Sequence, residues 1–248
     1  MLNSYEALFD VYDSLMYDVD YDSWCEYIIS LLPDGAKKIA ETACGTGNIT
    51  LRLAKRGYDV SASDISYEML DIAAKKSRKN GLHINFVCSD MCEMNFTHCD
   101  AVICCCDGVN YLKNVSMLES FFKKSYTALN PGGRLLFDIS SEYKLKEILA
   151  DNLFFDDSED VTYIWQNSYN DKTDSVEMAL TFFKKEGDKY VRQDEQQTQY
   201  AYSENTVLSL LRKCGFAASC YEFLTTESPN KKSERIQFCA QKPKETEN

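Results

Sequence analysis

The chain has 248 residues, of which 44% are hydrophobic and 27% are charged, as is usual for a globular domain. No apolar run approaches the roughly 20 residues that a membrane-spanning helix requires, so we expect no membrane association. The formal net charge is −12, which disfavours nucleic acid as a partner because phosphate backbones bind clustered cations. The N-terminus lacks the basic and apolar regions of a secretory signal, and we therefore expect a cytoplasmic protein.

Helix and strand signals alternate through the first 140 residues or so. Two short, aromatic-rich helices are expected between residues 5 and 32. The pattern then predicts strands at 37–42, 58–63, 84–88 and 101–105, and helices at 48–56, 66–80 and 116–128. Asn130-Pro131-Gly132-Gly133 is expected to break the chain before a fifth strand at 134–139. This order predicts an α/β fold with a doubly wound, mostly parallel sheet.

The pattern changes after residue 141. Residues 142–202 contain partly alternating apolar and polar stretches separated by turns, which predicts a small antiparallel β-insertion. Ser203 then caps a helix that ends near Gly215, and strands near 217–224 and 234–240 return to the main sheet. We therefore expect residues 1–141 and 203–248 to form a core domain, and residues 142–202 to form a β-rich insertion or lid.

A glycine-rich turn follows the first predicted strand. Gly45 and Gly47 have no Cβ, so the backbone can turn sharply and approach a ligand, while the next helix offers its first N–H groups. Asp64 closes the second strand, about 20 residues later, where a doubly wound sheet presents a carboxylate to ribose hydroxyls. This order predicts a nucleoside-cofactor site, although Asp64 could instead only cap a helix.

Eleven cysteines and two histidines raise the question of a disulfide framework or a metal site. There is no CxxC pair, and Cys104-Cys105-Cys106 lies in an apolar strand, so small buried thiols are the simpler interpretation. His98, beside Cys92 and Cys99, belongs to the one cluster with the ligand types of a zinc site. We expect no metal.

The segment Glu41-Thr42-Ala43-Cys44-Gly45-Thr46-Gly47-Asn48 and the element order resemble class I S-adenosylmethionine-dependent methyltransferases. The first motif of that family is an acidic residue followed by a Gly-x-Gly-x-Gly turn, whose first glycine is here Ala43. The resemblance implies a Rossmann-like, seven-stranded sheet with an antiparallel last strand. It also implies S-adenosyl-L-methionine as cofactor and S-adenosyl-L-homocysteine as product. The methionine half of the cofactor would be held by Glu41, Ala43, Gly45, Gly47 and Asn48.

The resemblance also implies contacts to the nucleoside half of the cofactor. Asp64 matches the family acid that binds both ribose hydroxyls through its paired oxygens. Ile65 and Met69 would line the adenine. In the segment Ser89-Asp90-Met91, Asp90 would accept from the exocyclic amine and a backbone N–H would face a ring nitrogen. A helix cap is the structural alternative for Asp90.

The segment after the fourth strand falls at the carboxyl edge of the sheet, where open α/β folds bind ligands. Cys106 would flank the cofactor sulfonium there. Asp107, Asn110 and Tyr111 could orient a methyl acceptor, or could lie solvated in a loop. Asp107 could act as a general base, or could only orient an already neutral nucleophile.

Residues 9–24 and the inserted β-segment resemble, more specifically, a bacterial branch of small-molecule-type methyltransferases in which both cover the cofactor. Tyr12, Tyr17 and Tyr21 are therefore candidates to close the site, with Tyr12 also a candidate base, because phenol rings give rigid apolar walls with a polar tip. Core packing of the same helices would explain these tyrosines equally well.

The predicted activity is methyl transfer to an unidentified small molecule by a monomer or a homodimer. In-line displacement mainly requires positioning in a water-poor pocket. A nicotinamide oxidoreductase shares the element order, but its fingerprint places a third glycine where this chain has Thr50. A cofactor-binding regulatory or assembly protein without catalysis is the other alternative.

Overall fold

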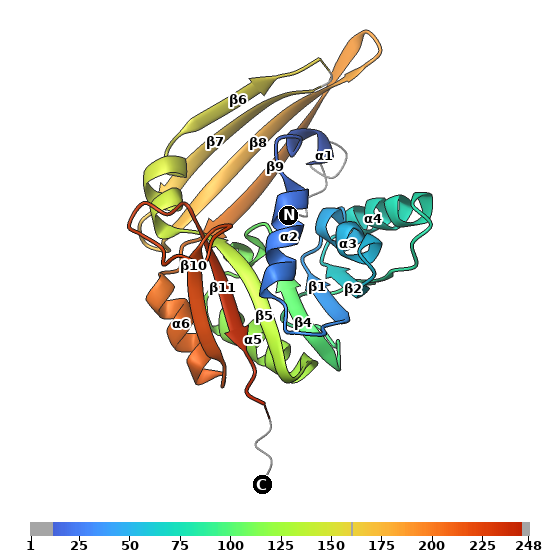
Figure 1. The fold of residues 1–248 in the computed structure, drawn as a ribbon. Helices are drawn as coiled ribbons and strands as arrows, with labels where there is room; N and C mark the ends of the chain where they lie inside the picture. The colour runs from blue at the N-terminus through green and yellow to red at the C-terminus, as the bar shows by residue number, and fades with distance from the viewer. Residues whose placement is uncertain (1–11, 160, 245–248) are drawn as a thin grey trace.

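A seven-stranded sheet organises the computed structural model, which describes residues 12–159 and 161–244 (Figure 1). The strand order is β10-β11-β5-β4-β1-β2-β3. These strands are β1 (Lys38–Thr42), β2 (Asp59–Asp64), β3 (Asn85–Cys88), β4 (Cys99–Cys104), β5 (Leu129–Ser140), β10 (Ala217–Glu222) and β11 (Arg235–Gln241). All neighbours pair in parallel except β11, which is antiparallel to both β5 and β10. The predicted α/β fold, with a mostly parallel sheet and an antiparallel last strand, is confirmed.

Helices cover both faces of this sheet. They are α1 (Tyr12–Leu15), α2 (Tyr21–Leu31), α3 (Asn48–Lys55), α4 (Tyr67–Lys79), α5 (Val115–Ala128) and α6 (Glu204–Lys213). One core cluster joins α2 to the sheet through Ile28 and Ile39, and the other joins α5 and α6 to the opposite face through Phe121 and Leu211. All four side chains are fully buried, and each such burial contributes about 2 kcal/mol. Residues 5–11 of the expected N-terminal helices lie outside the described residues.

The topology brings two loops to one edge of the sheet. Because β1 and β4 are parallel neighbours, with Ala40 opposite Val102, the turn after β1 and the segment after β4 leave the sheet at the same end. That segment continues into a short 3-10 helix, η1 (Gly108–Tyr111). Residues far apart in sequence therefore meet at the carboxyl edge of the strands.

The prediction that Asn130-Pro131-Gly132-Gly133 separates the preceding helix from the fifth strand is wrong in one respect. Strand β5 already begins at Leu129, and these residues are accommodated as an irregularity within it. Leu129 pairs with Cys99, whereas Arg134 pairs with Ala101, so the register shifts across the segment. The proline and glycines therefore mark a bulge and not the end of the pairing.

A second sheet contains four antiparallel strands in the order β6-β7-β8-β9 and projects from the core beside α1 (Figure 1). They are β6 (Leu153–Asp157), β7 (Val161–Asn170), β8 (Ser175–Glu186) and β9 (Lys189–Tyr200). The predicted antiparallel β-segment is confirmed, but β6 and a preceding π-helical turn, η2 (Lys144–Leu149), were not predicted. Strand β6 carries Leu153 and Phe155 exposed, so it lacks the one-sided pattern of a buried strand.

Within the described residues, no group of three or more His, Cys, Asp or Glu side chains could hold a metal ion. The thiols of the suspected zinc cluster donate to main-chain carbonyls instead, Cys92 to Met117 and Cys99 to Thr97. All eleven cysteines are free thiols. In the same part of the chain, no helix has the length and apolar character needed to cross a membrane.

Candidate active site

The turn between β1 and α3 is built from unusual backbone angles. Ala43, Gly45 and Gly47 all have positive φ, at 50°, 53° and 79°. A Cβ built on Gly47 would lie 2.8 Å from Leu51 Cδ1 and 3.1 Å from Ala73 Cβ, so this glycine lets the turn pack against α3 and α4. A Cβ on Gly45 would meet nothing within 4 Å, which leaves the backbone there open to a ligand.

Glu41 lies at the end of β1 and is almost completely buried. Burial raises the pKa of Glu41 to about 8; the hydrogen bond from the Thr50 hydroxyl opposes this shift and the nearby Asp64 adds to it. A neutral Glu41 is therefore the main form at neutral pH until a cation approaches. Thr50 occupies the place of the third glycine in a nicotinamide fingerprint. Its hydroxyl donates a hydrogen bond to the Glu41 carboxyl group.

Asp64 connects the ends of two strand-to-helix turns. Its Oδ2 accepts from the Gly45 N–H at 2.7 Å, and its Oδ1 accepts from the Ser66 N–H at 2.9 Å. Burial raises the pKa of Asp64, and these two backbone N–H groups partly offset the shift. Each carboxylate oxygen has a further lone pair, so both remain able to accept from a ligand hydroxyl.

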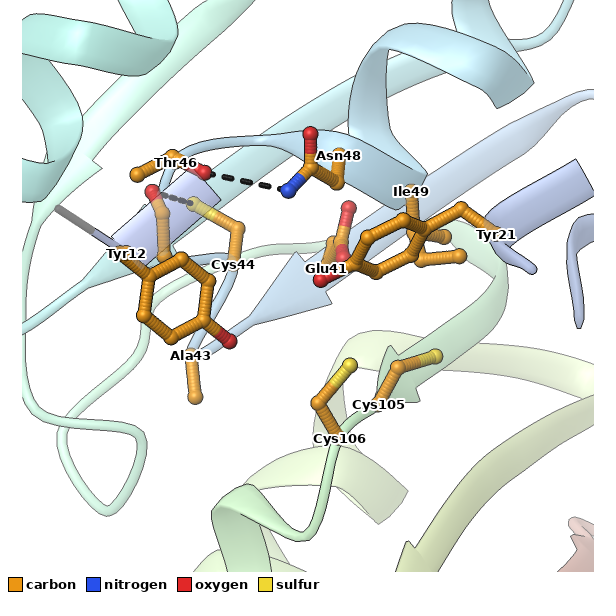
Figure 2. A pocket seen from close by; sticks show the side chains of 11 residues that line it. Tyr12, Tyr21, Glu41, Ala43, Cys44, Thr46, Asn48, Ile49, Cys105 and Cys106 are labelled. Atoms are coloured by element: carbon orange, nitrogen blue, oxygen red, sulfur yellow. Dashed lines mark hydrogen bonds between the residues drawn. The ribbon is translucent and has the colours of Figure 1, made fainter. Parts of the chain in front are cut away.

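A pocket opens at this edge of the sheet (Figure 2). Figure 2 shows the rings of Tyr12 and Tyr21 on one side of the pocket, with Glu41 at the end of β1 and with Cys105 and Cys106 on the other side. Burial raises the pKa of Tyr12 and of Tyr21 well above the usual range, so both stay protonated and can donate hydrogen bonds. The Tyr21 hydroxyl is buried, and its polar neighbours are the side chains of Tyr12 and Asn48. It can therefore also donate to a ligand in the pocket.

Seven of the predicted site residues share this pocket: Tyr12, Tyr21, Glu41, Ala43, Gly45, Asn48 and Cys106. The sequence interpretation missed four further lining residues: Cys44, Thr46, Ile49 and Cys105. Cys44 and Thr46 could have been found because they alternate with the glycines of the turn. Cys105 could have been found because it directly follows the neighbouring strand β4.

The remaining predicted cofactor residues lie outside this pocket. Tyr17 is 79% exposed in the turn between α1 and α2, so no contact of its side chain supports a role in closing the site. Met69 is buried against Phe182 and Val161 of the second sheet, which is a packing role. Ile65 is 63% exposed, and such an apolar surface beside Asp64 leaves room for an adenine.

The third strand is followed by a tight turn at Asp90 and Met91. Asp90 Oδ1 accepts from the Cys92 N–H at 2.8 Å, so the alternative of a local cap describes its contact in this structure. A Cβ on Gly108 would lie 3.0 Å from Ala43 Cβ and 4.0 Å from Met91 Cε. Met91 therefore lies close to the glycine turn and to the start of η1, on the side where the resemblance places the adenine.

Asp107 is held by several neighbours. Its Oδ2 accepts from the Ser140 hydroxyl at 2.8 Å and from Gln199 Nε2 at 3.1 Å, and its Oδ1 lies 3.6 Å from Arg235 Nη1. Arg235 also forms an ion pair with Asp138 and lies over the Trp24 ring at 5.2 Å. A carboxylate with this many partners is suited to orienting neighbours, and less to taking a proton. The geometry therefore favours the positioning alternative for Asp107.

Strand β9 presents a row of buried polar side chains to the core. Glu195, Gln197 and Gln199 alternate along the strand, so they share one face, and all three are at least 92% buried. Gln197 accepts from the Tyr111 hydroxyl at 2.7 Å and donates to Glu195, while Gln199 reaches Asp107. Sequence reasoning missed this row because its partners lie 86 and 92 residues away in the chain.

Comparison with known proteins identifies the family. Residues 39–133 match the family described as "Methyltransferase domain". The chain is 38% identical over 244 residues to the putative methyltransferase YqeM of Bacillus subtilis (strain 168), covering 97% of this chain and 98% of the relative. A solved S-adenosylmethionine-dependent methyltransferase from Clostridium acetobutylicum ATCC 824 is 33% identical, with a TM-score of 0.87, covering 94% and 97% of the two chains. The chain belongs to the S-adenosylmethionine-dependent methyltransferases.

A more distant structure supports the fold alone. The sugar N-methyltransferase KedS8 from Streptoalloteichus sp ATCC 53650 is 16% identical, with a TM-score of 0.77, and the match covers 95% of this chain and 93% of that one. The match therefore includes the second sheet as well as the core. Membership in the methyltransferase family replaces the oxidoreductase and non-catalytic alternatives.

S-adenosylmethionine is the cofactor, and the residues at the carboxyl edge fit it. The absence of a side chain at Gly45 leaves space for a ligand, the Tyr21 hydroxyl can donate a hydrogen bond, and Glu41 offers a carboxyl group to a cationic amine. Asp64 and Ile65 follow on the side where ribose and adenine would lie. Methyl transfer needs no redox partner, so these residues have only to bind, orient and exclude water.

Proposed function

We propose that this methyltransferase acts on a small molecule that carries an amine, bound between Tyr12, Tyr111 and the inner face of β9. The observation that carries the proposal is the row of Glu195, Gln197 and Gln199, which buries polar groups next to the segment that follows β4. These side chains pair with one another, with Tyr111 and with Asp107, and such a connected polar face suits a polar ligand better than an apolar one.

The charges at this face favour an amine. Asp107 and Glu195 bring two carboxylates to it, at opposite ends of the Gln197–Gln199 stretch, and Arg235 partly offsets the charge of Asp107. Each carboxylate can accept a hydrogen bond from an amine N–H, which fixes the direction of the nitrogen lone pair. A carboxylate-bearing acceptor would instead meet like charges and would lose binding free energy.

Tyr12, Asp107 and Tyr111 are the proposed acceptor-site residues. Tyr12 acts as a hydrogen-bond donor and wall, because burial raises its pKa too far for it to serve as a base. Tyr111 donates to Gln197 and so ties η1 to β9. Asp107 orients the acceptor through the same network. When bound, S-adenosylmethionine supplies an electrophilic methyl group, and the chain holds a neutral amine in line with it in a water-poor site.

We also propose which residues hold each part of the cofactor. Glu41, Ala43, Gly45, Gly47 and Asn48 hold the methionine half, Asp64 holds the ribose, and Cys106 flanks the sulfonium. Ile65, Asp90 and Met91 lie beside the adenine, whereas Met69 packs against the second sheet and not against the ligand. The amine also agrees with the name of KedS8, a sugar N-methyltransferase, and with that of a glycine/sarcosine N-methyltransferase from Halorhodospira halochloris, 33% identical over 141 residues.

The proposal also covers the location of the protein, its oligomeric state and the class of acceptor that it excludes. A net charge of −12 disfavours nucleic acid as the acceptor, and eleven free thiols suit the reducing cytoplasm. Residues 142–202 would act as a lid domain on the core of 1–141 and 203–248. The exposed edge of β6 would permit a homodimer, and otherwise the protein is a monomer, which light scattering distinguishes.

The test is a panel of amines, alcohols and carboxylic acids with radiolabelled S-adenosylmethionine. We expect methylation of amines, and a roughly tenfold higher acceptor KM in Glu195→Gln with unchanged cofactor affinity. Asp194→Asn is the matched control, because Asp194 neighbours Glu195 but is exposed on the other face. Methylation of alcohols or acids only, or equal effects of the two substitutions, would contradict the proposal.

A further inference from the structure

Asp13, in the short helix α1, contacts the glycine turn directly. Its Oδ1 accepts from the Thr46 hydroxyl at 2.7 Å and from Asn48 Nδ2 at 2.9 Å. Its Oδ2 lies 2.7 Å from Lys76 Nζ of α4. One carboxylate therefore joins α1 to three residues that come from the cofactor turn, the start of α3 and α4.

Lys76 belongs to the core side of this network. Its Nζ also donates to the Thr46 carbonyl at 3.1 Å and to Asn48 Oδ1 at 3.0 Å. Lys76 therefore stays bound to the glycine turn whether or not Asp13 is in place, and Asp13 is the contact that α1 contributes. The network thus links α1 to the glycine turn, which Lys76 holds from the core side.

The residues of the turn that Asp13 contacts line the cofactor pocket. Thr46 and Asn48 form part of its wall, and Tyr12, which precedes Asp13, forms another part. Tyr12 and Leu15 also pack against the cluster of Met69 and Phe182. A shift of α1 away from the turn would therefore move Tyr12 and open that wall of the pocket.

The other surface ion pairs of α4 do not link elements in this way. Lys75 pairs with Asp71 four residues earlier in the same helix, so this contact stabilises α4 alone and contributes little. At Asp13, burial raises the pKa, but the hydrogen bonds from Lys76, Thr46 and Asn48 outweigh it and leave the pKa below the usual value. The carboxylate is therefore charged at neutral pH.

We propose that Asp13 is a positioning residue for the cofactor, because it fastens the Tyr12 wall to the glycine turn and so slows release of the bound nucleoside. The effect depends on the cofactor and not on the identity of the acceptor. It therefore stands or falls separately from the proposed amine specificity.

The test measures the dissociation rate of S-adenosylhomocysteine by surface plasmon resonance on the full-length protein. Asp13→Ala is expected to raise this rate about fivefold, since a charge-assisted network is lost at a partly exposed site. Lys76→Ala is expected to raise it similarly, and the double variant by less than the product of the two effects, because the two residues share one network. Lys75→Ala, the matched control at the preceding position of α4, is expected to leave the rate unchanged.

Two further measurements keep the proposal open to refutation. Thermal unfolding without ligand should stay within a few degrees of wild type for Asp13→Ala, because the contact is local. Asp13→Asn keeps one acceptor oxygen but loses the charge, and should give an intermediate rate even if Lys76→Ala fails to fold. An unchanged rate in Asp13→Ala, an equal rise in Lys75→Ala, or multiplying effects in the double variant would overturn it.

Discussion

The carboxylate of Asp64, at the end of β2, accepts a hydrogen bond from the backbone N–H of Gly45, in the turn after β1, over 2.7 Å. Gly45 has a positive φ, a backbone conformation that glycine adopts readily and that this contact helps to hold. If Asp64 faces the ribose and the glycine turn faces the methionine, as proposed above, this hydrogen bond joins the two halves of the cofactor site. One side chain would then order both halves before the ligand arrives.

Asp64→Ala should therefore weaken S-adenosylmethionine binding by on the order of 100-fold, because a charged hydrogen-bond acceptor is lost at two places. Calorimetric titration with S-adenosylmethionine, S-adenosylhomocysteine and NADH checks this, with NADH as the ligand that should not bind. Asp71→Ala, a substitution of an exposed carboxylate on α4, serves as the control. Retained binding of the sulfur nucleosides in Asp64→Ala would remove Asp64 from the site.

Glu41 should couple cofactor binding to proton release. Burial raises its pKa to about 8, so at pH 7 the group is mostly protonated. If the cofactor ammonium meets Glu41, the charged form becomes favoured and a proton leaves. Calorimetry at pH 7 in two buffers of different ionisation enthalpy should show this release in wild type and not in Glu41→Gln. Equal proton release in both proteins would assign it to another group.

The same shift predicts a pH dependence of stability without ligand. The folded pKa lies above the ordinary value of 4.5, so the contribution of Glu41 is complete below about pH 4.5 and is lost as the pH rises through 8. The free energy of unfolding of Glu41→Gln should therefore fall less between pH 5 and pH 8 than that of wild type. Urea unfolding at both pH values measures the difference, and parallel losses would argue against it.

Adding a methyl group at Gly47 should destabilise the protein, whereas removing the methyl group of Ala43 should stabilise it. Gly47→Ala is expected to cost about 2–3 kcal/mol, from the positive φ and from the 2.8 Å approach to Leu51. Ala43→Gly should relieve the positive φ at a smaller cost in unfolded-chain entropy, for a net gain of about 0.5 kcal/mol. Chemical unfolding of both variants tests this, and a destabilised Ala43→Gly would show that its methyl group packs usefully.

Arg235 should be required for folding stability because it neutralises two carboxylates. Arg235→Met leaves Asp138 and Asp107 without their cation, and we expect a loss of about 3 kcal/mol. Adding Asp138→Asn should recover most of this loss, since the buried charge is then removed. If the double variant is no more stable than Arg235→Met in urea unfolding, packing on Trp24 and not charge is the main role.

Asp107→Asn should affect the acceptor and not the cofactor. The substitution keeps the shape but turns one oxygen into a donor that faces Ser140, Gln199 or Arg235. We expect turnover to fall about tenfold, with the dissociation constant of S-adenosylmethionine within twofold of wild type. Equal losses in turnover and cofactor affinity would show that Asp107 only holds the fold together.

The sequence alone determined the order of elements in the core sheet, the sheet type and the position of the cofactor turn, but not β6 or η2. These features depend on local signals: apolar runs in β1 and β4, glycines at Gly45 and Gly47, and an acid at the end of β2. Each signal acts within a few residues, where propensity and backbone angles decide the outcome. The family resemblance rested on these same local features.

Only the tertiary structure decided which partners those residues meet. Nothing near Asp13 in sequence indicates Lys76, and nothing near Asp107 indicates Gln199 or Arg235, since these contacts join segments from 63 to 128 residues apart. The second sheet brings β9 to η1 because its inner face must be buried against the core. Long-range burial, which no local pattern encodes, therefore sets the proposed acceptor site and the Asp13 contact.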